Sequence, residues 1–166
     1  AARFDEKTPR THAMTPRSTF TRRLVASAAL LLAGAPAFAQ TALPLAELGA
    51  GMYRIEAEVA HTFETRQVGL MNRAAMPLHR GMVFVFPEAR AHCMWMKNTP
   101  LPLSVAFVDD HGKVINIEDM QPHTTDNHCA AGPVRFALEM NLGWFAARGI
   151  KAGDTLRGFE RLPAPR

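Results

Sequence analysis

The sequence predicts a mainly β domain of the α+β kind. We expect a compact β-sandwich or barrel-like fold of about seven short strands with two short helices. Two observations support this prediction. Apolar and polar residues alternate with a period of two in several segments, and other segments are short apolar runs bounded by Gly, Pro or Asp. The chain has 166 residues. After removal of a predicted N-terminal leader, the remainder has the length of one domain with one core.

The first predicted strand covers residues 53–59, where Tyr, Ile, Ala and Val alternate with Arg and Glu. A short helix is predicted next. Thr62 is its candidate N-cap and Gly69 its candidate end, although position 65 holds a threonine where a capping box would have an acid.

Five further strands are predicted toward the C-terminus. They cover residues 82–86, 103–108, 113–120, 134–140 and 155–160, and a hairpin turn at 109–112 joins the second to the third. After the fourth, Asn141 is expected to cap a second helix through Trp144 and Phe145, which Gly149 would end.

The N-terminal 39 residues are predicted to be upstream sequence and a cleaved signal peptide. Arginines precede an apolar run of 15 residues, shorter than the roughly 20 that span a bilayer, and the run closes on a small-x-small pattern. We expect cleavage between Ala39 and Gln40, no stable membrane anchor after processing, and a periplasmic or secreted location. The remaining chain divides into a turn-rich lead-in (40–51), the β-rich domain (52–161) and a tail expected to fray (162–166).

The charge balance argues against nucleic-acid binding. Six of the 19 Lys and Arg residues and two of the 15 acids precede Gln40, which leaves 13 of each in the remainder. A domain with no excess of cations lacks the electrostatic footprint that phosphate-backbone binding requires. We therefore expect a small-molecule, polymer or protein ligand, and no nucleic acid.

Five motifs occur across residues 52–160. They are Glu64-x-x-x-x-Gly69-Leu70-Met71, Gly81-Met82-x-Phe84-x-Phe86, Met94-Trp95-Met96-Lys97-Asn98-Thr99, Phe107-x-Asp109-x-x-Gly112 and Leu138-Glu139-x-x-x-Gly143-Trp144-Phe145. Their order and spacing resemble the family called DUF192, or UPF0127. The resemblance implies a compact β-rich domain, often secreted, without established catalytic residues. Many relatives carry an aromatic residue where Met94 stands here.

Cys93 and Cys129 are the only two cysteines, and both lie in the part predicted to be exported. An even count in an oxidising compartment favours a disulfide, which would disfavour the unfolded state by roughly 4 kcal/mol in the chain-entropy model. The alternative is a redox-active or metal-binding pair. The absence of a Cys-x-x-Cys motif favours the structural bridge.

Copper is one alternative function. If residues 93–97 form a strand, His92, Met94 and Met96 project from the same face. One imidazole and two thioethers suit Cu(I), so the chain would be a periplasmic Cu(I)-binding protein with copper as its cofactor. The other interpretation is that the thioethers fill gaps in the core and the protein needs no cofactor.

A ligand site is predicted where this strand passes into a polar turn. Trp95, Lys97, Asn98 and Thr99 offer an aromatic ring, an ammonium group, an amide and a hydroxyl there. Such a group suits an anionic or polyhydroxyl ligand. Asn98 and Thr99 are also good turn formers, so a structural role stays open.

Lys97, Asp109 and Glu139 are the first residues to test for acid–base catalysis, because a hydrolase or lyase would bring them into one cleft. Each has a structural alternative: Asp109 can bond the backbone of its own turn, and Glu139 can pair with Arg135 or Lys97. Common enzyme signatures are missing from the sequence. We therefore predict a non-catalytic binding or accessory module, with a Cu(I)-binding protein and an unrecognised hydrolase or lyase as alternatives.

Overall fold

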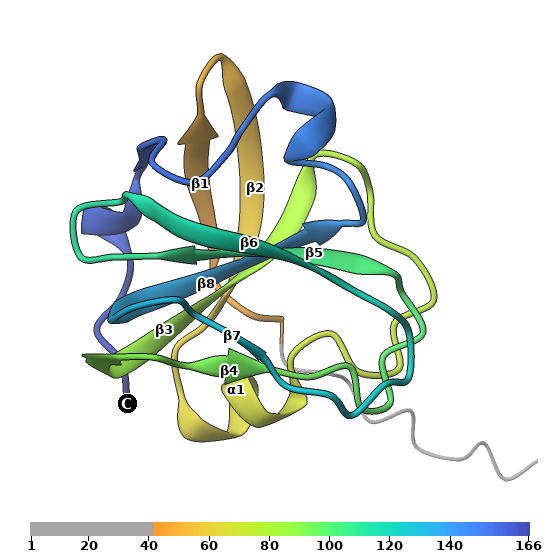
Figure 1. Ribbon diagram of the computed structural model, residues 1–166. Coiled ribbons are helices and arrows are strands. Elements are labelled where there is room, and N and C mark those ends of the chain that lie inside the picture. Colours follow the sequence, from red (N-terminus) through yellow and green to blue (C-terminus); the bar gives the residue numbers. More distant parts are fainter. Residues whose placement is uncertain (1–41) are drawn as a thin grey trace, which may run out of the picture. The chain divides into compact units, whose positions relative to one another are not determined.

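The computed structural model describes residues 42–166 (Figure 1). The predicted leader and its cleavage position between Ala39 and Gln40 lie outside these residues. The elements are β1 (Leu45–Ala50), β2 (Tyr53–Ala60), α1 (Phe63–Val68), β3 (Arg80–Arg90), β4 (Cys93–Met94), β5 (Leu103–Val108), β6 (Val114–Met120), β7 (His128–Cys129), β8 (Val134–Asn141), η1 (Ala146–Arg148), β9 (Leu156–Arg157) and η2 (Phe159–Arg161). Within this part of the chain, every helix is too short or too polar to cross a membrane.

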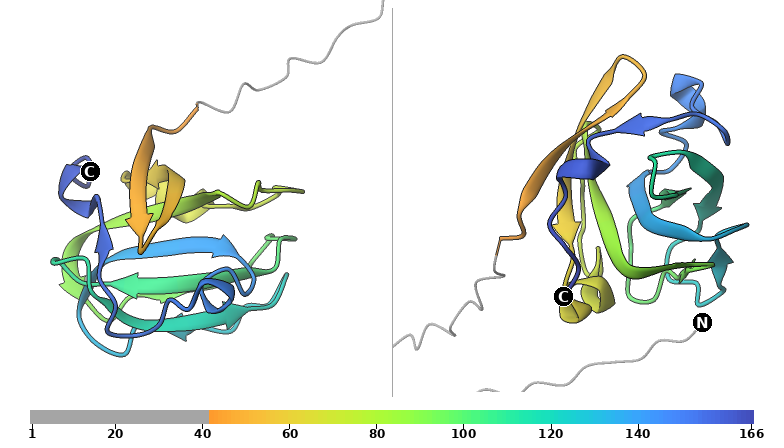
Figure 2. Two further views of the ribbon diagram at one scale, coloured as in Figure 1. Left: turned by 90° about the horizontal axis from the view of Figure 1, so that it is seen from above. Right: turned by 90° about the vertical axis from the view of Figure 1, so that its left-hand side faces the viewer.

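The mainly β prediction is confirmed. Seven strands form one sheet in the order β6-β5-β8-β3-β2-β1-β9, and β4 with β7 forms a separate small sheet. The sheet curls, so that β1 and β2 lie opposite β5, β6 and β8 while β3 crosses between the two layers (Figure 2). The curl brings the two edges together, because Lys113 bridges Thr155 and the Leu156 amide donates to the Gly112 carbonyl at 2.8 Å.

Each face of the sheet carries its own apolar cluster. Leu138 and Met140 on β8 belong to a cluster that includes residues from both edge regions of the sheet, and it therefore fills the inside of the curl. Ala137 points to the opposite face, where a second cluster contains Met94 and Met96. Connecting segments and the small β4–β7 sheet cover this outer cluster. Both faces of β8 are thus buried.

Helix α1 starts and ends where the sequence predicts. The Thr62 Oγ1 accepts the Thr65 amide at 3.2 Å, and the Thr65 Oγ1 accepts the Thr62 amide at 3.0 Å. The hydroxyl of Thr65 thus does what the acid of a capping box does elsewhere. Gly69 follows as the C-cap with φ 49°. The prediction for both ends is confirmed.

The lead-in prediction for residues 40–51 is wrong for β1, which occupies Leu45–Ala50. This strand pairs antiparallel with β2 along all six of its residues. Its sequence contains Ala46 and Gly49 and lacks the strong alternation of β2. The pairing partner, which sequence patterns do not reveal, stabilises the strand.

The predicted helix around Trp144 is also wrong. Residues 142–145 form turns, only η1 follows, and Gly149 ends it with φ 67°. Asn141 is the last residue of β8, and its side-chain amide donates to the Met76 carbonyl at 3.1 Å instead of capping a helix. Trp144 and Phe145 are buried core side chains. Their burial holds the turn, so the segment needs no regular helix.

The C-terminal segments differ from their predictions in a similar way. The strand predicted at 155–160 is limited to β9, and η2 follows it. The tail was expected to fray, but the Arg166 amide donates to the His61 carbonyl at 2.7 Å. This contact ties the last residue to the end of β2.

Candidate functional site

A pocket of about 380 Å³ lies beside the small β4–β7 sheet, and we call it the Trp95 pocket. Helix α1, strand β3 and the segment around β4 supply most of its lining. The lining residues are Phe63, Arg66, Gln67, Phe84, Phe86, Pro87, Arg90, His92, Cys93, Met94, Trp95 and Asn127. The sequence singled out residues 92–95, and all four line this pocket.

The pocket has an apolar floor and two exposed aromatic rims. Phe84 and Met94 are buried members of the outer core cluster and Phe86 packs against it. Phe63 remains 63% exposed and Trp95 43% exposed. Large aromatic side chains left in contact with water around an apolar hollow mark a surface that can bind a ligand.

A disulfide closes one wall of the pocket. Cys93 on β4 and Cys129 on β7 are directly opposite each other, and their sulfur atoms are 1.99 Å apart. The predicted bridge is confirmed. It links the two strands of a sheet that has only two residue pairs, so this wall depends on the bridge more than the large sheet does.

His92 is held in one tautomer. Its ring stacks on Phe86 with 3.7 Å between ring centroids, and its Nε2 donates to the Glu88 carbonyl at 2.8 Å. Burial lowers the pKa of His92; the Glu88 hydrogen bond opposes this, and the Arg90 and Arg66 charges add to the lowering. A carbonyl only accepts hydrogen bonds, so the proton of the neutral ring is on Nε2 and Nδ1 is an acceptor. The Arg90 Nε donates to this Nδ1 at 3.5 Å.

Arg66 is fixed by backbone oxygens instead of an acid. Its guanidinium donates to the carbonyls of His61 at 2.8 Å, Val85 at 3.0 Å and Arg166 at 3.3 Å. Within residues 42–166, neither Arg66 nor Arg90 takes part in an ion pair. Burial lowers the pKa of Arg66 and the nearby Glu64 carboxylate opposes this, but no Asp or Glu is among the residues that line the pocket.

The predicted ligand cluster divides in two. Trp95 lines the pocket, and the Lys97 Nζ lies 5.3 Å from the centroid of its ring. Asn98 adopts φ 54°, and its carbonyl accepts the Asn72 amide at 2.8 Å. Thr99 is buried, and its Oγ1 donates to the Lys97 carbonyl at 3.2 Å. Asn98 and Thr99 therefore shape the turn and join it to the segment after α1.

The three residues proposed for acid–base work lie in different settings. The Asp109 Oδ1 accepts the amides of His111 and Lys113, both at 2.9 Å, so it bonds its own turn. Lys97 is exposed. Glu139 is buried in the middle of β8, opposite Val105 of β5, four residues before Asp109. The sheet register thus separates Asp109 from Glu139 along the strands.

Glu139 has an unusual environment. Burial raises its pKa to about 8, so its carboxyl group is largely protonated at neutral pH. The suggested pairing with Arg135 or Lys97 is wrong, because Arg135 donates to the Phe86 carbonyl and no ion pair involves Glu139 in the described part of the chain.

The copper ligands proposed from the sequence alternate in burial as expected, since His92, Met94 and Met96 are all buried. Met94 and Met96 belong to the outer core cluster, and Met96 is 0% exposed. The Nε2 of His92 bonds a carbonyl. This arrangement favours the interpretation that the two thioethers fill the core.

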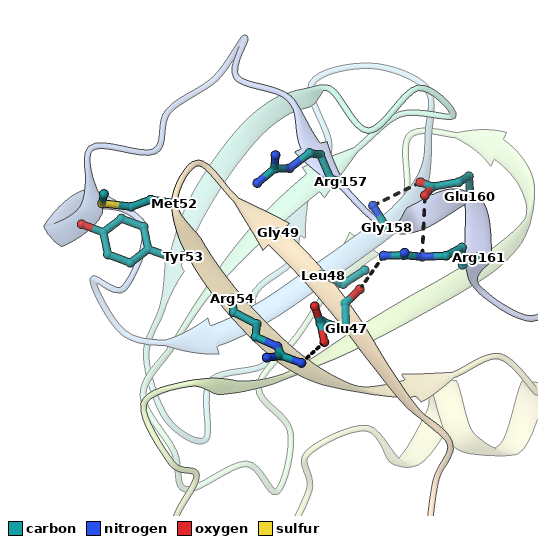
Figure 3. A pocket seen from close by; sticks show the side chains of 10 residues that line it. All are labelled: Glu47, Leu48, Gly49, Met52, Tyr53, Arg54, Arg157, Gly158, Glu160 and Arg161. Carbon is teal, nitrogen blue, oxygen red and sulfur yellow. Dashed lines mark hydrogen bonds and ion pairs between the residues drawn. The ribbon is translucent and has the colours of Figure 1, made fainter.

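A second hollow, of about 390 Å³, lies where β1 meets β9 (Figure 3). We call it the charged hollow. Arg54 pairs with the Glu47 carboxylate, and Arg161 pairs with Glu160 at 3.7 Å. Arg157 donates to the Gly51 carbonyl at 2.7 Å. Its acidic and basic side chains largely satisfy one another.

Sequence reasoning missed most of the lining of the Trp95 pocket, including the exposed Phe63 and both arginines. Phe63 carried a usable signal, because a large aromatic residue in a short helix must be either buried or at a surface with a function. Arg66 and Arg90 carried none. Their importance depends on which acids lie nearby in space.

The family DUF192, described as "Uncharacterized ACR", matches residues 46–158. The chain belongs to the DUF192 family. The match starts at the second residue of β1 and ends after β9, so it spans nearly the whole curled sheet of this DUF192 domain. A comparison with curated proteins finds no match.

Two solved structures share this fold. One is from Sinorhizobium meliloti 1021 and is named a "putative transcription regulator"; it is 32% identical, has a TM-score of 0.69, and the alignment covers 72% of this chain and 97% of that one. The other, from Novosphingobium aromaticivorans, is described as a protein of unknown function; it is 32% identical with a TM-score of 0.68, over 75% of this chain and 94% of that one.

Proposed function

We propose that this DUF192 protein is a non-catalytic binding module that holds a small molecule with an apolar body in the Trp95 pocket. The observation that carries the proposal is the pair of exposed aromatic rims, Phe63 and Trp95, around a floor of buried apolar side chains. A ligand that covers both rings removes apolar surface from water, which is the main favourable term in small-molecule binding.

The expected affinity follows from the covered area. If a ligand covers on the order of 100 Å² on each rim, the apolar contribution is about 5 kcal/mol before the loss of ligand freedom. The loss of ligand freedom offsets part of this term, so a dissociation constant of roughly 0.2 mM is the tightest binding that these two rings alone would give. The natural ligand binds more tightly if polar contacts add to this term.

The proposal is tested with an uncharged probe, 4-phenylbutanamide, titrated into the full chain while tryptophan fluorescence is recorded. Trp95 is at the rim, whereas Trp144 is only 3% exposed, so the signal is expected to change in the wild type and in Trp144→Phe but not in Trp95→Phe. Phe63→Ala is expected to weaken binding by more than tenfold, because the ring supplies about half of the roughly 5 kcal/mol apolar contribution. A saturable signal that persists in Trp95→Phe would contradict the proposed site.

Val68→Ala is the matched control for Phe63→Ala. Val68 is on the same helix and is 51% exposed, yet it does not line the pocket. It is expected to leave binding of the probe unchanged. Equal effects of the two substitutions would indicate a general disturbance of α1, and the assignment of the pocket would fail.

The proposal places the protein outside the cytoplasm, in the periplasm or the medium. The predicted signal peptide supports this location, and a bridged pair of cysteines suits an oxidising compartment. Mass spectrometry of the protein recovered from the periplasm is expected to find Gln40 as the first residue. Recovery of the intact N-terminal segment in the cytoplasm would contradict this part of the proposal.

A further inference from the structure

The charge of the Trp95 pocket is one-sided. Arg66 and Arg90 line it, and no Asp or Glu is among its lining residues. The charged hollow is different, because Glu47 and Glu160 face its arginines (Figure 3). A pocket that gathers cations without acids attracts anions and disfavours cations.

The two arginines have different roles in this field. The guanidinium of Arg66 uses its terminal nitrogens on three backbone carbonyls, so it supplies charge but little free hydrogen-bonding capacity. Arg90 uses only its Nε, which donates to His92. Among the described residues, its two terminal nitrogens have no hydrogen-bond partner.

His92 controls how Arg90 is presented. The ring is fixed by its stack on Phe86 and by the bond from Nε2 to the Glu88 carbonyl. Its Nδ1 therefore points a fixed acceptor at the Arg90 Nε. The free edge of the guanidinium is the pair of terminal nitrogens, and this planar edge matches the two oxygens of one carboxylate.

We infer that the ligand of the Trp95 pocket is an organic carboxylate, with its acid group on Arg90 and its apolar body between the rims formed by Phe63 and Trp95. This inference rests on the proposed function and deepens it by naming the class of ligand. His92 is a positioning residue in it, because it acts on the ligand only through Arg90. Arg66 adds to the positive potential.

A pair of probes that differ only at the head group tests the inference on the full chain. At low salt, 4-phenylbutanoate is expected to bind about tenfold more tightly than 4-phenylbutanamide, since a charge-assisted bidentate contact replaces a neutral one. The preference is expected to shrink as salt is added. Equal affinities for the two probes would overturn the inference and leave the proposed function intact. Failure of both probes to bind would overturn the proposed function itself.

Substitutions of Arg90 test whether this residue causes the preference for the carboxylate probe over the amide probe. Arg90→Gln is expected to bring the two probes to similar affinities, and Arg90→Lys to keep part of the preference because it retains charge without the fork. Arg157→Gln, in the charged hollow, is the matched control and is expected to keep the full preference. A tenfold preference that survives in Arg90→Gln would overturn the assignment. Unfolding curves of all three variants check that each one folds.

His92→Phe tests the positioning role, because phenylalanine can keep the stack on Phe86 while it removes the Nδ1 acceptor. The preference for the carboxylate is expected to fall about threefold, while the affinity for the amide probe changes less. An unchanged preference would overturn the role of His92.

Discussion

The Trp95 pocket and the charged hollow have nearly the same volume, about 380 and 390 Å³, but they treat their arginines in opposite ways. In the charged hollow, Arg54 on β2 pairs with Glu47 on β1, and Arg161 pairs with Glu160 of the same short helix, η2. In the Trp95 pocket, Arg66 and Arg90 have no acid partner within residues 42–166. Volume therefore does not distinguish the two. Among the described residues, neither arginine of the Trp95 pocket has an acid partner, whereas in the charged hollow this is true only of Arg157, which donates to the Gly51 carbonyl.

The two regions also differ in what holds them. The charged hollow is built on β1, which pairs with β2 along its full length. The wall of the Trp95 pocket is a sheet of two residue pairs joined by the disulfide. The first prediction therefore concerns the loss of this wall.

The largest effect is expected from removal of the disulfide. The Cys93→Ser/Cys129→Ser double variant frees a segment with a sequence separation of 36, so the free energy of unfolding is expected to fall by about 4 kcal/mol in the chain-entropy model. Urea unfolding of the variant and the wild type measures this loss. The binding of 4-phenylbutanamide is expected to weaken as well, because Cys93 lines the pocket. A loss under about 1 kcal/mol would show that the small sheet is held by other contacts.

Glu139 is a buried acid that forms no ion pair within residues 42–166. Its pKa is about 8 when folded, against an ordinary value of 4.5. Between these two pH values the unfolded chain releases a proton that the folded protein keeps, so the free energy of unfolding falls as pH rises through this window. At pH 7 the accumulated loss is about 3 kcal/mol.

Glu139→Gln removes this titration, and its free energy of unfolding is expected to decline less than that of the wild type between pH 5 and 8. Urea unfolding at a series of pH values measures both curves. Aspartates that titrate near their ordinary pKa affect both proteins equally, so the difference between the curves isolates Glu139. Parallel curves would mean that the carboxyl group is ionised in the folded protein.

Arg66→Gln tests whether a cation held by carbonyls contributes to stability. The guanidinium bonds three backbone oxygens on separate segments, and hydrogen bonds from charged groups are the stronger kind. We expect the variant to lose about 2 kcal/mol of unfolding free energy, since glutamine can replace only part of this set. Thermal and urea unfolding give the value. No loss would mean that water satisfies these carbonyls equally well.

The smallest effect is expected in the charged hollow. Arg54 and Glu47 form an ion pair whose side chains are both more than half exposed. Exposed pairs are weak, so Arg54→Gln is expected to change the free energy of unfolding by about 0.5 kcal/mol or less. A loss as large as that of Arg66→Gln would remove the contrast between the two regions.

Several features were predictable because their causes are local. The alternation at residues 53–59 placed β2, and Thr62 with Gly69 placed both ends of α1. The pairing of Cys93 with Cys129 followed from their count and the expected compartment. The family resemblance followed from motifs along almost the whole domain.

Other features were missed because their causes are distant in the sequence. Strand β1 depends on β2, and the turn after Asn141 depends on the burial of Trp144 and Phe145. Phe63 and Trp95, 32 positions apart, had no visible connection before α1 and β4 were placed side by side. For Asn98 the sequence left a turn and a ligand contact equally open, and the structure shows the turn conformation, with φ 54°.

The sequence by itself determined the mainly β class, the bridged cysteines and the family, because side-chain periodicity, cysteine count and ordered motifs are properties of the chain. Only the tertiary structure decided which charges are compensated. Arg54 pairs with Glu47 because β1 and β2 lie side by side, whereas Arg66 bonds backbone carbonyls and forms no ion pair within residues 42–166. Electrostatic interactions act over distances in space, so a cation becomes available to a ligand only when folding has placed the acids elsewhere.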